Sequence, residues 1–225
     1  MSALKELRHV LAAHRRKAGA AQSMPETWVF NQIDANSVRR AAVLILFGGA
    51  GGHTVDGHSS PSDLDLLFVR RAETLRKHAG QIGFPGGGID PGDDSPVAAA
   101  LREAVEETGV DTEGIEVLGQ LMDAELPITN FLVTPVIGWW KSESPVHAVD
   151  EAESAEVFRA PVAQLLDPRR RLSAVVHRGS ERFASPAFDY DGKLIWGFTA
   201  IVLDRLFNEL GWTRPWNADR ELVLR

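Results

Sequence analysis

The amino-acid sequence predicts an α+β fold in which a mixed β-sheet lies between layers of helices. Continuous apolar runs of strand length flank a central helix on both sides, and amphipathic helices precede and follow them, which is the pattern of a sheet covered by helices. The chain has 225 residues, enough for one domain with a sizeable core, and no internal repeat or linker divides it. We therefore expect residues 1–225 to form a single domain, with its core at about residues 38–210.

Before residue 80 the sequence predicts one helix and two buried strands. Residues 41–47 and 64–69 are continuous apolar runs suited to strands that are buried on both faces. Between them, residues 48–62 are rich in Gly, His and Ser, which is typical of a flexible loop rather than of a metal site. Residues 3–17 form an amphipathic helix whose basic face we expect in solvent, and its apolar side carries Leu4, Leu7, Val10 and Leu11.

The central helix has clear ends in the sequence. Ser95 is a good N-cap, Pro96 fits the first helical position because its missing N–H costs nothing there, and Gly109 is a typical C-terminal stop. The sequence therefore predicts a helix over residues 96–108. One stripe at helical spacing is expected to face the core, and it consists of Val97, Leu101, Ala104 and Val105.

After residue 110 the sequence predicts four more strands and two more helices. The strongest signal is Asp191-Gly192, a two-residue hairpin turn between two short strands. Trp139 and Trp140 are core candidates, whereas the basic run at residues 169–171 is interpreted as a solvated patch. The expected strands are residues 115–122, 131–140, 187–190 and 193–196, and the expected helices are residues 161–166 and 198–210.

The outer face of the central helix carries Glu103, Glu106 and Glu107, with Arg102 as the adjacent cation. Residues three and four apart are neighbours on a helix, so these carboxylates repel one another. Hard oxygen ligands of this kind bind Mg²⁺ or Mn²⁺, although a solvated acidic face would give the same pattern. The Gly-rich residues 86–92 favour the functional interpretation, because glycine backbone lets a phosphate approach closely.

The spacing of these residues resembles the Nudix box, G-x5-E-x7-R-E-U-x-E-E-x-G-U, in which U is an aliphatic residue. The match runs from Gly88 through Asp94 to the segment at residues 102–110, REAVEETGV. Asp94 stands where the box usually has Glu, and Ala104 is a small version of the aliphatic residue. The pattern is long and fixed in spacing, which argues against chance agreement.

The region just upstream is similar to the additional signature of coenzyme A pyrophosphatases, which reads roughly LLTxRS…RxxxGxxxFPGG. Here it reads LLFVRR at residues 66–71, RKHAGQ at residues 76–81 and FPGG at residues 84–87. Phe68 and Arg71 depart from the Thr and Ser of the signature, which weakens the substrate prediction but not the reaction prediction. The resemblance covers about residues 40–205.

The resemblance implies the Nudix α/β/α sandwich and metal-dependent hydrolysis of a pyrophosphate bond in a nucleoside diphosphate derivative. Mg²⁺ or Mn²⁺ would be held by Glu103, Glu106 and Glu107 and would offset charge that develops in the transition state. Arg102 would orient a glutamate. A carboxylate would take the proton of the attacking water, and the sequence leaves open whether Glu106, Glu107 or Glu153 does so.

The resemblance favours coenzyme A or one of its derivatives as substrate, with 4′-phosphopantetheine and adenosine 3′,5′-bisphosphate as products. The basic residues between positions 70 and 78 would clamp nucleotide phosphates, since Arg suits bidentate phosphate contacts. A solvated connection is the alternative interpretation of this cluster. The residues expected to bind substrate are Arg70, Arg76, Phe84, Gly86 and Gly87.

Composition narrows the range of partners. Lys and Arg number 24 against 31 Asp and Glu, and the net charge of −7 argues against nucleic-acid and membrane-surface binding, which leaves a small-molecule nucleotide. The absence of cysteine excludes disulfides, thiolate metal sites and cysteine nucleophiles. No segment has the apolar length of a signal peptide or a membrane span, so we expect a cytoplasmic protein. A homodimer is compatible with the sequence, which does not reveal the oligomeric state.

Two alternatives stay open at the level of the sequence. A Nudix hydrolase of another substrate, such as ADP-ribose, NADH, a nucleotide sugar or a nucleoside triphosphate, would share the same box. A non-catalytic Nudix module that binds a nucleotide would not need the three glutamates, which are intact in this chain.

Overall fold

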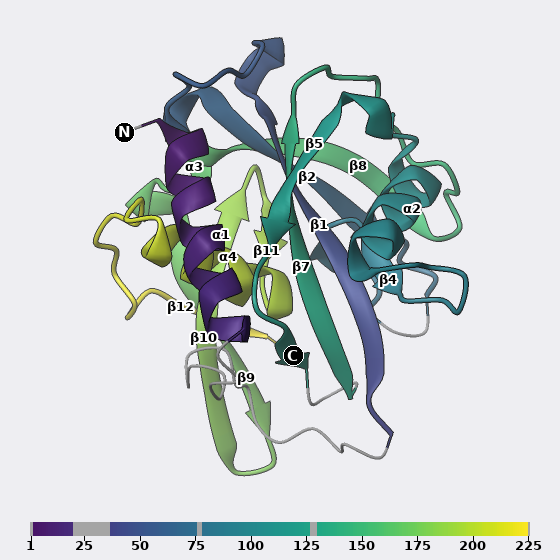
Figure 1. The fold of residues 1–225 in the computed structure, drawn as a ribbon. Helices are drawn as coiled ribbons and strands as arrows, with labels where there is room; N and C mark the ends of the chain where they lie inside the picture. Colours follow the sequence, from purple (N-terminus) through teal and green to yellow (C-terminus); the bar gives the residue numbers. More distant parts are fainter. Residues whose placement is uncertain (1, 20–36, 76–77, 127–129, 225) are drawn as a thin grey trace.

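The computed structural model describes residues 2–19, 37–75, 78–126 and 130–224 and confirms a mixed α+β fold (Figure 1). The larger sheet has eight strands in the order β3-β2-β1-β7-β5, with β4, β6 and β8 paired to β1, β7 and β2. Its strands are β1 (Arg39–Gly49), β2 (Leu64–Arg71), β3 (Ile82–Gly83), β4 (Gly86–Gly88), β5 (Ile115–Gln120), β6 (Ala124–Leu126), β7 (Phe131–Trp140) and β8 (Ser154–Pro161).

A second, four-stranded sheet has the order β11-β10-β9-β12. Its strands are β9 (Arg171–Arg178), β10 (Glu181–Tyr190), β11 (Lys193–Ile195) and β12 (Glu221–Leu224). The α-helices of the described chain are α1 (Ala3–Gly19), α2 (Pro96–Thr108), α3 (Val162–Leu165) and α4 (Phe198–Glu209), and the short 3-10 helices are η2 (Ala50–Gly52), η3 (Pro61–Asp63), η4 (Thr112–Gly114) and η5 (Pro168–Arg170). None of the described helices combines the length and the apolarity that crossing a bilayer requires.

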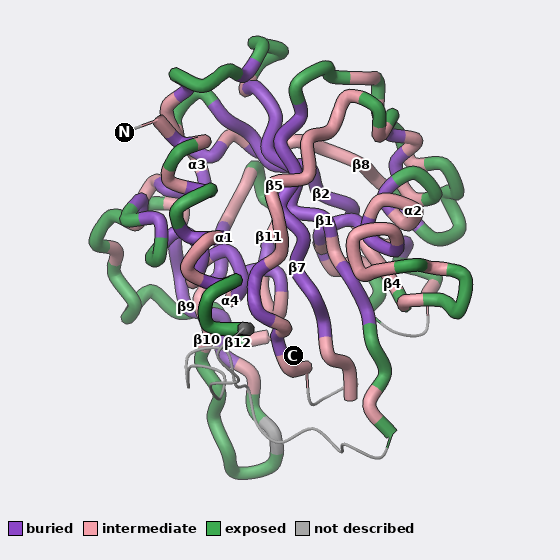
Figure 2. The backbone as a smooth tube through the Cα atoms, viewed as in Figure 1, coloured by how far each residue is buried: buried purple, intermediate pink, exposed green. Residues whose placement is uncertain are grey.

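The central strand β1 is buried over most of its length, as its continuous apolar sequence predicts (Figure 2). It pairs in parallel with β7 and antiparallel with β2 and β4. Ala42, Leu44 and Leu46 pack with α2, whereas Ile45 and Phe47 belong to the core cluster that includes α1 and α4. The larger sheet therefore lies between α2 on one face and α1 with α4 on the other, as predicted (Figure 1).

Helix α2 begins and ends where the sequence predicts. The Ser95 hydroxyl accepts a hydrogen bond from the backbone N–H of Ala98, and Gly109 is left-handed with φ of 67°. The predicted apolar stripe is wrong at Val105, which is 42% exposed. Successive helical residues are rotated by about 100°, so Ala104 and Val105 cannot both face the sheet. The small alanines on the inner side let α2 approach β1 closely.

The smaller sheet is the part of the fold that the sequence predicts least. The hairpin turn at Asp191-Gly192 is confirmed, because both residues have positive φ, 49° and 75°. Strand β9, most of β10, and β12 are not predicted. The first four residues of β10 are exposed, and the strand contains Pro186, so its sequence lacks the alternating apolar pattern that marks a half-buried strand.

The interpretation of residues 169–171 as a solvated patch is wrong for Arg171. Its side chain is only 1% exposed and forms an ion pair with Asp204 of α4. The guanidinium also lies over the rings of Phe188 and Trp216, 4.4 and 4.6 Å from their centroids. Arg171 therefore joins the smaller sheet to α4 and to the segment that precedes β12, because its planar cation can stack and pair at the same time.

This burial predicts that Asp204→Ala destabilises the protein, because it leaves the Arg171 guanidinium without its carboxylate. We expect the free energy of unfolding to fall by about 3 kcal/mol, since removing one partner of a buried pair leaves an uncompensated charge. Glu221→Ala is the matched control, because its ion pair with Arg182 is exposed, at 40% and 48%. Urea denaturation of both variants checks this, and equal losses in the two would contradict it.

Candidate active site

The glycine strand β4 fixes the position of the acidic face of α2. Gly86 and Gly88 are the ends of a short antiparallel pairing with β1, in which Gly87 lies opposite Ala42. A Cβ atom on Gly87 would lie 2.4 Å from the Glu103 carboxylate, closer than folded proteins tolerate. Glycine at this position therefore lets the helix place a carboxylate directly against the strand backbone.

Two of the glutamates, Glu103 and Glu107, are partly buried against this strand. The backbone N–H of Gly86 donates a hydrogen bond of 3.0 Å to Glu107 Oε2. Burial raises the pKa of Glu107 to about 7, although this hydrogen bond and the nearby Arg71 oppose the rise. Burial also raises the pKa of Glu103, against the effect of a hydrogen bond from Arg102. Burial thus disfavours the charged form of both carboxylates, which is a common arrangement at functional sites.

Arg102 ties the acidic face to the loop before the helix. Its Nε and Nη2 donate to the two carboxylate oxygens of Asp93 at 3.1 and 3.0 Å, and Nη2 also donates to the Gly88 carbonyl at 3.1 Å. Its Nη1 donates to Glu103 at 3.1 Å and to Glu106 at 2.9 Å. The hydrogen bonds from Arg102 lower the pKa of Asp93. Arg102 therefore bonds to two of the glutamates, and its role of orienting one of them stays a prediction.

The three glutamates predicted to bind metal lie on one helix but do not form a cage. Across residues 2–19, 37–75, 78–126 and 130–224, no three His, Asp or Glu side chains form a group that could hold a metal ion. Glu103 and Glu106 bond to Arg102, and Glu106 is 58% exposed. Glu107 instead bonds to β4.

The structure brings Glu153 close to the acidic face of α2. It lies in the turn before β8, where its carbonyl oxygen accepts a 2.9 Å hydrogen bond from the backbone N–H of Ala72. The charge of Glu153 is one of the causes that raise the pKa of Glu107, after burial. The two carboxylates are therefore within electrostatic range, although Glu107 lies in the Nudix box and Glu153 lies well beyond it in the sequence.

Arg71 is not among the individual residues expected to bind substrate, although it belongs to the basic cluster expected to clamp phosphates. The sequence places it only within a basic cluster, whereas in the structure its Nη1 lies 4.0 Å from Glu107 Oε1. The pairing of β2 with β8 shifts register between Arg70 and Arg71, and such an irregularity re-aims a side chain. The buried Nε of Arg71 has no hydrogen-bond partner in the described part of the chain. The signal in the sequence that could have identified Arg71 is its position as a cation at the end of a buried strand.

Two residues expected to bind substrate, Arg70 and Phe84, contact other parts of the protein. Arg70 Nε donates to Glu156 at 3.2 Å, and its Nη1 lies 3.7 Å from Glu73. Phe84 is only 6% exposed and its ring stacks on Phe68 at 5.6 Å, so the ring belongs to the core, and its substrate contact stays a prediction. Burial of this ring stabilises the fold, because it removes apolar surface from water. Arg76 lies outside the described residues.

The sequence and the fold both have known relatives. A family model described as the NUDIX domain matches residues 39–177. An uncharacterized Nudix hydrolase NudL of Cronobacter sakazakii is 41% identical over 146 residues, which are 65% of this chain and 75% of that protein. The protein of the same name from Yersinia enterocolitica is 38% identical over 145 residues, 64% of this chain and 73% of that protein.

Among solved structures, RenU, a Nudix hydrolase from M. smegmatis, superposes with a TM-score of 0.50 at 18% identity and covers 82% of this chain and 96% of that chain. That likeness is one of fold alone. The matched family region contains β4 and the whole of α2, with Arg102 and the three glutamates. The chain therefore belongs to the Nudix hydrolases, a family of enzymes that act on phosphorus anhydrides of nucleotide derivatives.

Proposed function

We propose that this Nudix hydrolase cleaves the pyrophosphate bond of coenzyme A or a derivative, and releases 4′-phosphopantetheine and adenosine 3′,5′-bisphosphate. The observation that carries the reaction is the contact of α2 with β4, where Glu103 lies against Gly87 and Glu107 bonds to the strand backbone. The segments that resemble coenzyme A pyrophosphatases, residues 66–71 and 84–87, lie on β2 and at the start of β4 beside that contact. They support the substrate part of the proposal.

The carboxylate oxygens of α2 fit Mg²⁺ or Mn²⁺, which prefer hard oxygen ligands. Glu103, Glu106 and Glu107 would hold the ion, whose charge offsets that of the diphosphate and activates water. Arg102 Nη1 has to release two of these glutamates for that to happen. Its remaining hydrogen bonds to the loop before α2, made by Nε and Nη2, would keep the guanidinium in place.

Glu153 is the carboxylate best placed to take the proton of the attacking water. The other acids of the site would be engaged, since Glu103, Glu106 and Glu107 would hold the metal ion and Glu107 also accepts a hydrogen bond from β4. The Glu153 side chain makes no hydrogen bond or ion pair with another described residue. An unengaged carboxylate near the reacting centre is what general-base catalysis requires.

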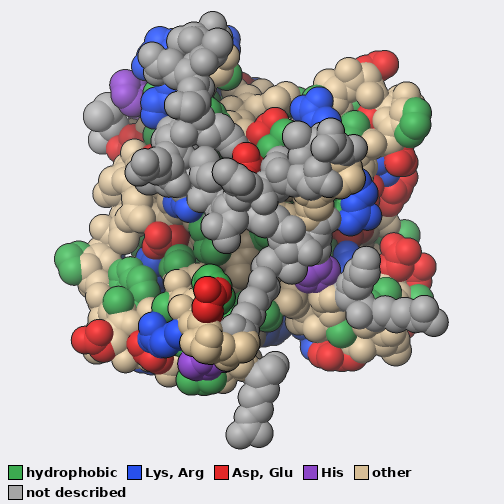
Figure 3. Space-filling view, turned by 90° about the horizontal axis from the view of Figure 1, so that it is seen from below, with side chains coloured by type: hydrophobic (Ala, Val, Ile, Leu, Met, Phe, Trp, Pro, Cys, Tyr) green, Lys and Arg blue, Asp and Glu red, His purple; other side chains and the backbone are tan. Residues whose placement is uncertain are grey.

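Local cations, and not the charge of the whole protein, would hold the substrate. The net charge is −7, and Figure 3 shows acidic and basic side chains interspersed over the face seen from below. Arg71, whose Nε is unused, is a guanidinium directly beside Glu107. Arginine donors suit phosphate oxygens, so Arg71 would hold the diphosphate near the carboxylates. The expected partner is a small-molecule nucleotide.

The close contact at β4 predicts different effects for two neighbouring glycines. Gly87→Ala places a Cβ at 2.4 Å from the Glu103 carboxylate, which is the mobile end of its side chain and can move aside without unfolding the protein. We expect Mn²⁺ affinity and kcat/KM each to fall about tenfold or more, because a ligand has been displaced. Gly88→Ala is the control, since nothing lies within 4 Å of its added Cβ. Mn²⁺ binding is measured by electron paramagnetic resonance. Equal affinities in the two variants would contradict the proposal that the contact of Gly87 with Glu103 positions a metal ligand.

If Glu153 is the general base, its replacement should lower the catalytic rate without weakening metal binding. Glu153→Gln should bind Mn²⁺ as the unmodified protein does and lower kcat by about 100-fold, the usual contribution of a general base. Glu151→Gln, in the same turn, is the matched control and should retain activity. Steady-state kinetics beside a Mn²⁺ titration separates the two effects. A Glu153→Gln enzyme with the kcat of Glu151→Gln would remove the assignment.

A substrate panel tests the proposed function most widely. The purified chain with Mg²⁺ or Mn²⁺ is compared on coenzyme A, acetyl-coenzyme A, 3′-dephospho-coenzyme A, ADP-ribose, NADH and a nucleotide sugar. We expect the highest kcat/KM for the two 3′-phosphorylated coenzyme A species, because the basic cluster between positions 70 and 78 supplies cations for an additional phosphate. Faster turnover of NADH or ADP-ribose than of any coenzyme A species would overturn the substrate proposal.

A further inference from the structure

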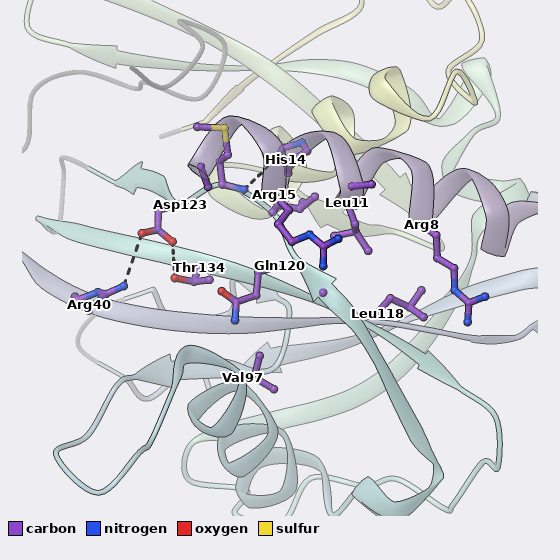
Figure 4. Close-up of a pocket in the computed structure, with 15 residues that line it drawn as sticks. Arg8, Leu11, His14, Arg15, Arg40, Val97, Leu118, Gln120, Asp123 and Thr134 are labelled. Atoms are coloured by element: carbon purple, nitrogen blue, oxygen red, sulfur yellow. Dashed lines mark hydrogen bonds and ion pairs between the residues drawn. The ribbon is translucent and has the colours of Figure 1, made fainter. Parts of the chain in front are cut away.

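A hollow of about 710 Å³ lies at the opposite edge of the larger sheet, between α1, β5 and the first turn of α2 (Figure 4). None of the residues proposed for catalysis or substrate binding lines it. Strand β4 pairs with β1, β1 with β7 and β7 with β5, so three strand spacings, about 14 Å, separate β4 from β5. The hollow is therefore separate from the site at β4 and does not depend on the proposed reaction.

The lining of the hollow is apolar on three sides. Leu11 comes from α1, Leu118 from β5 and Val97 from the first turn of α2. Figure 4 shows the Val97 side chain directed from α2 toward the strand above it. Pockets of about 300–1,000 Å³ with this kind of lining are typical sites for small molecules.

The charge of the lining is positive and incompletely compensated. The charged side chains that line it are three arginines and one carboxylate, Arg8, Arg15, Arg40 and Asp123. Arg8 bonds to Glu116 at 2.8 Å on the rim, and Arg40 lies 3.8 Å from Asp123. Arg15, in contrast, has no hydrogen bond or ion pair with any other residue in the described part of the chain. One guanidinium beside an apolar wall is thus available to an anion.

A second polar group lies near this guanidinium. Residues three and four apart share one face of a helix, so Arg8, Leu11 and Arg15 all project from the side of α1 that borders β5. Gln120 follows an irregularity in the pairing of β5 with β7, between Val117 and Gly119. Figure 4 shows the Arg15 guanidinium and the Gln120 amide both directed into the space between α1 and α2. Together they offer several donors to one anionic group.

We propose that this hollow is a binding site for a small amphipathic anion. The alkyl body of the ligand packs against Leu11, Leu118 and Val97, and its carboxylate or phosphate accepts hydrogen bonds from Arg15 and Gln120. Burial of the alkyl chain supplies affinity, and the charge-assisted hydrogen bonds select an anion over a neutral molecule.

Calorimetric titration of the full chain with four probes tests the chemistry of the site. Octanoate and octyl phosphate carry both features, octyl glucoside has the alkyl body without the charge, and inorganic phosphate has the charge without the body. We expect both octyl anions to bind at millimolar concentration or below, one molecule per chain, and the other two probes to bind at least about tenfold more weakly. No saturable binding of either octyl anion, or equal binding of octyl glucoside, would overturn the proposal.

Two variants locate the binding. Arg15→Gln should weaken both octyl anions by about tenfold, whereas Arg16→Gln, its exposed neighbour outside the hollow, should leave the affinity unchanged. Ala12→Leu fills part of the hollow from α1 and should abolish binding while the thermal midpoint stays close to that of the unmodified protein. Equal affinities in Arg15→Gln and Arg16→Gln would place the anion elsewhere and refute the assignment. Retained binding in Ala12→Leu would refute it as well.

Discussion

Helix α2 lies so close to strand β4 that only a glycine fits between the Glu103 carboxylate and the strand backbone. The pairing of β4 with β1 sets the strand in place, and the alanines on the inner side of α2 let the helix approach β1. The same approach brings Glu107 within hydrogen-bonding distance of the Gly86 N–H. The close packing of α2 against β4 and β1 therefore determines where the acidic side chains of the site lie.

A crowded acidic face needs compensation even without a metal ion, and Arg102 supplies it. One guanidinium bonds at once to Asp93, Glu103 and Glu106, so it neutralises part of the repulsion that three close carboxylates create. Its strongest anchor is Asp93, the neighbour of the Asp94 that aligns with the Nudix box. The hydrogen bonds to the loop leave Nη1 as the part that can yield to a cation without loss of the arginine's position.

The sequence predicted those features of the fold that are determined by a few adjacent residues. The caps at Ser95 and Gly109, the buried run of β1 and the turn at Asp191-Gly192 each need only a few adjacent residues. Contacts between distant segments were not predictable. Arg171 reads as one of three surface arginines until Asp204 and two rings enclose it, and the role of Arg71 depends on a register shift against β8. Phe84 belongs to a motif, yet its burial is set by Phe68 on another strand.

The proposed reaction requires that the carboxylates of α2 hold divalent cations. Anomalous scattering from a crystal soaked in Mn²⁺ tests it directly, because manganese can then be located without reference to activity. We expect anomalous peaks within ligand distance of Glu103, Glu106 and Glu107, with Arg102 Nη1 turned away from the first two and its bonds to Asp93 retained. A crystal without a peak at α2, in which Arg102 still bonds to both glutamates, would contradict the account.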